Sequence, residues 1–227
     1  MDNVDLLNRY LKGERNFTDL VLTGENFRAV DLSHANFTGC DLSCAELGFA
    51  DLRHTCLVNC NLTAAYLGSA QLIGANLTGA FLARASLNKS NLQQVNLSSV
   101  NLHHASLIGA NLRGAKLVGA FLIGTNLSGA DLTGADLTGA CLSEAMMIGT
   151  NLTQANLNRA NLSKANLTEA NLNDAFLLRT NLSEANLTGT QLIGAKLSQT
   201  NLTKAILIKS IDEVVGKNEP KMSGQRL

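Results

Sequence analysis

The chain has 227 residues, with 18 basic and 18 acidic side chains, no Trp and a single Pro, so the aromatic side chains that fill most globular cores are scarce. A neutral charge balance excludes the simplest kind of nucleic-acid or anionic-membrane binder, and no apolar run approaches the roughly 20 residues of a membrane helix. The first residues include acids and lack the apolar segment of a signal peptide, which predicts a soluble, cytoplasmic protein.

Residues 1–14 are expected to form an N-terminal helical cap. Val4, Leu7 and Leu11 have helical spacing, with Leu6 and Tyr10 beside them. We expect this amphipathic helix to cover the first turn of the segment that follows.

Residues 15–209 repeat with a period of five. From Phe17 onward, every fifth residue is Leu, Phe or Met at 39 successive positions, ending at Leu207 without an insertion. A small residue, mostly Ala, stands two positions earlier, and Asn or Asp usually lies between them. On a helix, every fifth residue moves about 140° around the axis, and on a strand alternate leucines take opposite faces. The pattern therefore predicts short extended pieces joined by turns, coiled around a core of Leu and Ala.

Glycine marks the turns of this coil. Of the 19 glycines, 14 lie two residues after the central apolar residue, where a type II turn needs a positive φ. We expect type II corners there, and type I corners in units without glycine, such as NLNRA near residue 157 and NLSKA near residue 162.

Residues 210–227 differ from the repeat. Ser210, Ile211, Asp212 and Glu213 have the pattern of a capping box and predict a short helix that ends near Gly216. The polar, aperiodic KNEPKMSGQRL that follows is predicted to be disordered.

The runs GANLTGAFL, GANLRGAKL and TNLSGADLTGADL resemble those of pentapeptide-repeat proteins, whose shared pattern is A(D/N)LXX. The resemblance covers about six-sevenths of the chain. It implies an all-β solenoid, a right-handed quadrilateral β-helix with four units per coil, in which residues 20 apart stack on one face. It also implies frequent occurrence in cyanobacteria and, for most members, no established biochemical activity.

With four units per coil, one corner gathers groups that could bind a transition metal: His34, His54, Asp31, Asp51 and Cys56. The alternative is a solvated polar ladder in a repeat that favours Asp at this position. Cys40 and Cys60 are expected to point inward as small core residues. No cofactor is expected.

The sequence has no nucleophile–base spacing, phosphate loop or HExxH motif, and a coil without insertions offers no cleft, so the chain is not expected to be an enzyme. A rigid scaffold for protein–protein binding is the first hypothesis. The alternative is a DNA-mimicking inhibitor or protector of type II topoisomerase (gyrase), as some pentapeptide-repeat proteins are. That mechanism needs dense negative charge, yet no acidic residue lies between Asp51 and Asp131.

Large apolar residues at outward positions predict where a protein partner, or a second copy of the chain, would dock. One face carries Phe81, Phe121 and Ile123, and the next face carries Tyr66, Ile108, Met146 and Ile148. Together they span about five coils, roughly 20 Å along the axis. Asn101 between the two phenylalanines interrupts this surface, and Arg113 and Lys116 are expected at its rim.

Overall fold

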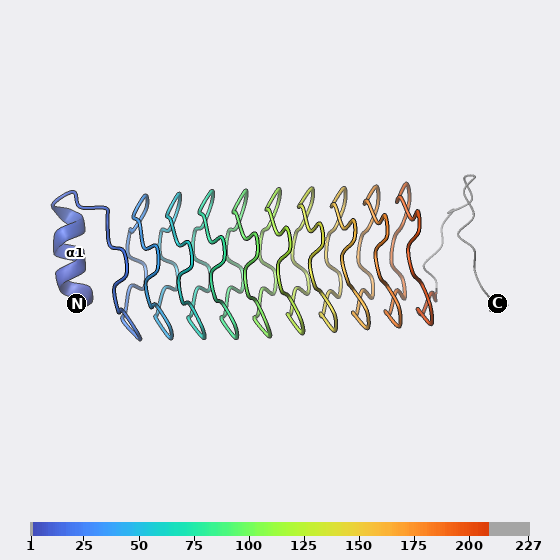
Figure 1. Ribbon diagram of the computed structural model, residues 1–227, viewed down its shortest axis with the longest axis horizontal. Coiled ribbons are helices and arrows are strands. Elements are labelled where there is room, and N and C mark those ends of the chain that lie inside the picture. Colours follow the sequence, from blue (N-terminus) through green and yellow to red (C-terminus); the bar gives the residue numbers. More distant parts are fainter. Residues whose placement is uncertain (1, 209–227) are drawn as a thin grey trace.

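The computed structural model describes residues 2–208, which form one short helix followed by a long, regular coil. Helix α1 spans Asn3–Leu11 and lies across one end of the rod (Figure 1). The predicted C-terminal helix and disordered tail lie outside the described residues. Within residues 2–208, no helix is long and apolar enough to cross a membrane.

Helix α1 caps the first coil through a different face from the expected one. Its N-cap residue Asp2 accepts a hydrogen bond from the N–H of Asp5 at 2.8 Å, which satisfies one free donor of the first turn. Leu6 and Tyr10 are buried in the core, and the Tyr10 hydroxyl donates to the carbonyl of Ser33 at 2.9 Å. The predicted cap is confirmed, but the spacing of Val4 and Leu11 was misleading, because both side chains are exposed.

Successive coils stack with a register of 20 residues. Parallel bridges join each unit to the unit four later, from Asn16 with Asn36 to Asn186 with Ile206. Backbone hydrogen bonds join each unit to the coil before it and to the coil after it. For example, the N–H of Asp131 donates to the carbonyl of Ala110 at 2.9 Å, and the N–H of Leu132 donates to the carbonyl of Asn151 at 2.7 Å. The predicted right-handed β-helix of four units per coil is therefore confirmed (Figure 1).

All corners use one conformation. The residue two after each central apolar residue has a φ between 54° and 72° at every corner from Asp19 to Lys204, whether or not it is glycine. The N–H of the next residue then closes the turn, as when Ala165 donates to Leu162 at 3.1 Å. These are type II turns, so the prediction of type I corners at Arg159 and Lys164 is wrong.

Stacking explains why glycine-free corners keep this conformation. The N–H of Lys164 donates to the carbonyl of Ser183 in the next coil at 2.9 Å, and Gly134 makes the same bond to Thr153 at 2.9 Å. A type I corner would turn this N–H away from its acceptor. An orphaned backbone donor costs about 1–3 kcal/mol, against about 1–2 kcal/mol for the left-handed conformation, so the ladder favours the positive φ.

The Asn or Asp that opens most units stabilises its own corner. Its side-chain oxygen accepts the N–H two residues later, as in Asp131, which binds the N–H of Thr133 at 3.0 Å. This is an Asx turn, and Asn and Asp are suited to it because their side chains are short. The repeated amide and acid in the sequence therefore shape the backbone.

The core is a column of leucines flanked by small residues. Leucines such as Leu132 are fully buried, and Phe17 stacks on Phe37 with ring centroids 5.7 Å apart. Cys40 and Cys60 point inward as predicted, where burial raises the pKa of both thiols. Where Thr takes the place of Ala in the core, its hydroxyl has a hydrogen-bond partner. The Thr125 hydroxyl, for example, donates to the carbonyl of Leu102 at 2.7 Å.

The coil has four faces, which we number in chain order. Face 1 holds the units that begin at residues 21, 41 and so on to 201. Faces 2 and 3 begin with the units at residues 26 and 31, and face 4 holds the units at residues 16, 36 and so on. Positions 20 residues apart stack directly on one face. The coils follow one another in a straight row (Figure 1).

Candidate interaction surface

Face 1 carries the two outward phenylalanines of the predicted surface. Phe81 and Phe121 are 51% and 48% exposed, and both bridge to Asn101, which lies between them. Ile123, on the same coil as Phe121, is partly buried and presents less of its side chain than the sequence indicates. The two phenylalanines are therefore separated by one coil at this column.

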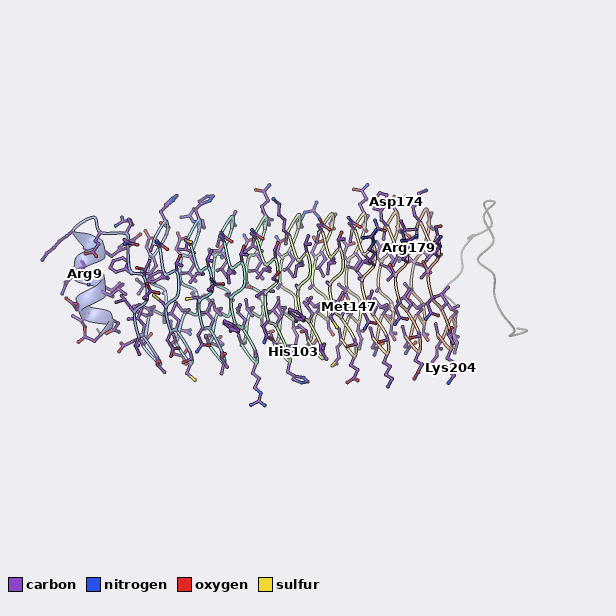
Figure 2. All side chains as sticks on the ribbon, in the orientation of Figure 1. Arg9, His103, Met147, Asp174, Arg179 and Lys204 are labelled. Atoms are coloured by element: carbon purple, nitrogen blue, oxygen red, sulfur yellow. The ribbon has the colours of Figure 1, made fainter. Side chains whose placement is uncertain are left out.

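His103 lies beside the gap between the two phenylalanines. Its ring stacks on that of Phe121, with centroids 6.3 Å apart and planes 15° from parallel. The side-chain oxygen of Asn101 accepts a hydrogen bond from the N–H of His103 at 3.1 Å, so the Asn101 side chain lies along its own corner. His103 lies about midway along the rod (Figure 2). His103 was not among the predicted surface residues, although its place two residues after Asn101 puts it one coil from Phe121.

The apolar surface also continues around the other edge of face 1. Val118, at the end of face 4, is 40% exposed and precedes Phe121 by three residues. The sequence analysis missed it because only faces 1 and 2 were compared. The signal was present, since position 118 is usually Thr, Ser or Asn in this column.

Face 2 contributes a second group of exposed side chains. Met146, Ile148 and Ile108 are 44%, 37% and 42% exposed. Ile108, Ser128 and Ile148 lie on successive coils. The N–H of Gly109 donates to the carbonyl of Ser128, and the N–H of Gly129 donates to the carbonyl of Ile148. The Ser128 hydroxyl between the two isoleucines is buried and has no hydrogen-bond partner among the described residues.

Tyr66 belongs to a different environment from the other predicted residues. Its side chain lies over Gly48 and Gly68, where an added Cβ would come within 2.5 Å of a ring carbon and within 2.6 Å of the hydroxyl oxygen, respectively. Arg28 also borders Gly48 and stacks on the ring of Phe49 at 4.7 Å. On face 2, two serines separate Tyr66 from the coils that follow. The structure thus divides the seven predicted residues into an N-terminal aromatic cluster and a central patch.

We define the central patch by its apolar and aromatic side chains in the middle coils. Its members are His103, Ile108, Val118, Phe121, Ile123, Met146 and Ile148. Phe81 lies at its N-terminal edge, on face 1.

The two residues of the predicted basic rim lie on different faces. Arg113 lies on face 3, where its guanidinium pairs with Asp131 at 3.1 Å, and Lys116 opens face 4, one face away from Phe121. Burial raises the pKa of Asp131, but bonds from Thr133 and Arg113 outweigh it and lower that pKa. The corner between faces 1 and 2 also carries charged side chains, among them Arg84 and Glu144, both exposed.

The candidate metal corner does not assemble. The rings of His34 and His54 stack on each other, with centroids 5.2 Å apart, and do not converge on a common point. The Asp31 carboxylate accepts the N–H of Ser33, which lowers its pKa, and Asp51 pairs with Arg53. Within residues 2–208, no three His, Cys, Asp or Glu side chains are placed to hold a metal ion.

Cys56, the remaining member of that hypothesis, faces elsewhere. Its thiol lies 3.2 Å from the hydroxyl of Thr38, on face 4. The polar-ladder alternative therefore describes this corner.

A four-sided coil with flat, loop-free faces and exposed apolar side chains in its middle coils defines a β-solenoid. The pentapeptide-repeat family model matches residues 16–47, 45–82, 65–103, 105–143, 145–183 and 180–210, in eight copies. The chain belongs to the pentapeptide-repeat family. Among curated proteins, none matches this sequence.

Solved structures of the family share the fold. HetL, a pentapeptide-repeat protein involved in heterocyst differentiation regulation from the cyanobacterium Nostoc sp. strain PCC 7120, is 33% identical with a TM-score of 0.75, over 91% of this chain and 95% of HetL. QnrB1, a plasmid-mediated fluoroquinolone resistance protein, is 19% identical with a TM-score of 0.55, over 83% of this chain and 90% of QnrB1. At that identity, QnrB1 supports the fold alone.

Proposed function

We propose that this chain is a non-enzymatic, rigid scaffold that binds protein through the central patch. The observation that carries the proposal is the set of large apolar side chains at outward positions where the repeat otherwise uses Asn, Ser, Thr or charged residues. Single exposed apolar residues are ordinary, but a cluster across neighbouring coils indicates a contact surface.

The regularity of the coil supports the same function. Core leucines and backbone ladders hold every coil in one register, so side chains on the faces need little reordering when a partner binds. Preorganisation of this kind lowers the entropic cost of association. The similarity to HetL, described as involved in regulation of heterocyst differentiation, favours a regulatory role for this scaffold.

The test compares proteins retained from a lysate of the source organism by the wild type and by the double variant Met146→Asn, Ile148→Thr. The repeat already uses Asn and Thr at these columns of face 2, so the fold should survive. We expect the variant to lose the partners that the wild type retains. A matched control is Phe176→Asn, Leu178→Thr on face 4, which removes the same kind of side chains outside the patch.

Identical partners for the wild type and the face 2 variant would contradict the role of the patch. Loss from the face 4 control as well would show that retention depends on general hydrophobicity.

The gyrase alternative has less support. The acid-free stretch between Asp51 and Asp131 covers four consecutive coils, and Arg53, Arg84 and Lys89 lie within it. A protein that imitates duplex DNA needs negative charge along its length at about the phosphate spacing. The charge of this rod is divided into an acidic N-terminal part, a weakly basic middle and a mixed C-terminal third.

A further inference from the structure

We propose that face 1 pairs with face 1 of a second copy of this chain, in an antiparallel, side-by-side dimer. The inference rests on the proposed function, because it names the partner of one of the two apolar faces. Two copies of one face must satisfy a two-fold axis, so each residue has to tolerate the residue that the axis places opposite it. This requirement can be checked position by position.

The axis lies perpendicular to the rod, halfway between Asn101 and Phe121 of the bridged column. It places Phe121 opposite Asn101 of the partner subunit, and Phe81 opposite Cys141 of the partner subunit. Each large ring thus meets a small side chain. Phe121 enters the space that Asn101 leaves between two phenylalanines, which is how interfaces reach close packing.

The neighbouring column of face 1 is also complementary. The same axis places His103 opposite Ile123 of the partner subunit. Because His103 stacks on Phe121, each subunit would present a two-ring surface to an isoleucine. The centre of the interface is then apolar and aromatic, as in well-packed interfaces.

Charges at the corner next to face 1 match in the same register. Arg84 is placed opposite Glu144 of the partner subunit, twice by symmetry. Both side chains are exposed, and neither forms an ion pair within residues 2–208. Further along this corner, Lys164 faces Ala64 and Glu184 faces Cys44 of the partner subunit, so no like charges meet.

Shifting the axis by half a coil removes these matches. With the axis at Asn101, Phe81 would oppose Phe121 of the partner subunit, and Arg84 would oppose a glycine. The preferred axis also bisects the described coil, whose bridges extend from Asn16 to Ile206. The two rods would therefore overlap along their full length.

The size of the contact determines how the dimer should be sought. The coil is about 45 Å long at about 4.8 Å per turn, and a face of three extended residues is about 10 Å wide. The pair then buries roughly 900 Å² in total, near the lower limit for specific interfaces. We expect a reversible dimer with a dissociation constant of about micromolar or weaker.

The first experiment is sedimentation equilibrium of the full chain, from roughly 1 µM to roughly 1 mM, around the expected dissociation constant. The wild type should approach twice its mass of 24.0 kDa. Glu144→Arg should weaken association more than about tenfold, because two pairs of like charges would then meet. Arg84→Glu should do the same, and the double variant that exchanges the two charges should restore the dimer.

Glu184→Arg is the matched control. It makes the same change at the same corner, two coils away, and at the same backbone conformation, with φ of 60° at both positions. Its association should equal that of the wild type. A monomer at every concentration, or a dimer indifferent to both single charge variants, would overturn the proposal.

A cross-link tests the antiparallel register directly. Phe81→Cys places a thiol opposite Cys141 of the partner subunit, and mild oxidation should yield a covalent dimer that is absent from Phe81→Cys, Cys141→Ser. An equal yield from both variants would contradict the register. The proposed function can fail independently, since the lysate comparison changes only face 2 and these experiments use purified protein.

Discussion

Every corner of the coil needs one residue with a positive φ, and most of these residues are not glycine. A side chain in this left-handed conformation costs about 1–2 kcal/mol, yet Arg159, Lys164 and Glu184 all adopt it. The chain adopts this conformation repeatedly because the corner N–H groups from Asp19 to Gly189 are bonded to the next coil. Residue preference at a corner is therefore secondary to the ladder.

Gly134→Ala isolates this conformational cost. Gly134 has a φ of 65°, and an added Cβ would meet no atom within 4 Å, so backbone strain is the main consequence. We expect a loss of about 1 kcal/mol in the free energy of unfolding, measured by chemical denaturation. Lys164→Ala is the control, because it exchanges one side chain for another at φ of 59°. A comparable loss in the control would show that the side chain, and not the conformation, decides stability.

Helix α1 illustrates what an element's sequence can and cannot specify. The helical spacing was readable, but two overlapping apolar stripes were available, one through Val4, Leu7 and Leu11 and one through Leu6 and Tyr10. The Tyr10 hydroxyl can reach the Ser33 carbonyl only if the second stripe faces the coil. Contacts with the first coil determine which stripe is buried, and the helix sequence alone does not specify them.

Leu6→Ala should therefore destabilise the protein, whereas Leu11→Ala should not. Leu6 is fully buried, and removing its side chain at the end of the coil should cost about 2–5 kcal/mol. Leu11 is 82% exposed, so its truncation should change stability by less than about 0.5 kcal/mol. Thermal and chemical denaturation of both variants would measure the difference. Equal losses would mean that the helix packs through its other stripe.

At the scale of the whole rod, the five-residue period is enough to assign the inward and outward positions of the coil. It does not place ring stacking such as that of His103 on Phe121, because the leaning of a side chain toward the next coil depends on what that coil presents. The same limit explains Tyr66, whose ring folds over two glycines one residue before a corner. Periodicity therefore predicts which face a side chain lies on. It does not predict which neighbour that side chain contacts.

The charge pattern of the whole rod predicts how it behaves toward a DNA-binding enzyme. The purified protein, at about micromolar concentration, should not inhibit DNA supercoiling by a type II topoisomerase, because four consecutive coils present no carboxylate where a DNA mimic needs regular negative charge. The control is a variant with Arg84→Asp and Lys89→Asp, which adds acids to this stretch and should move any residual effect toward inhibition. Inhibition by the wild type at this concentration would mean that the acidic N-terminal coils, from Asp19 to Asp51, suffice for the contact, and the scaffold proposal would then have to give way to DNA mimicry.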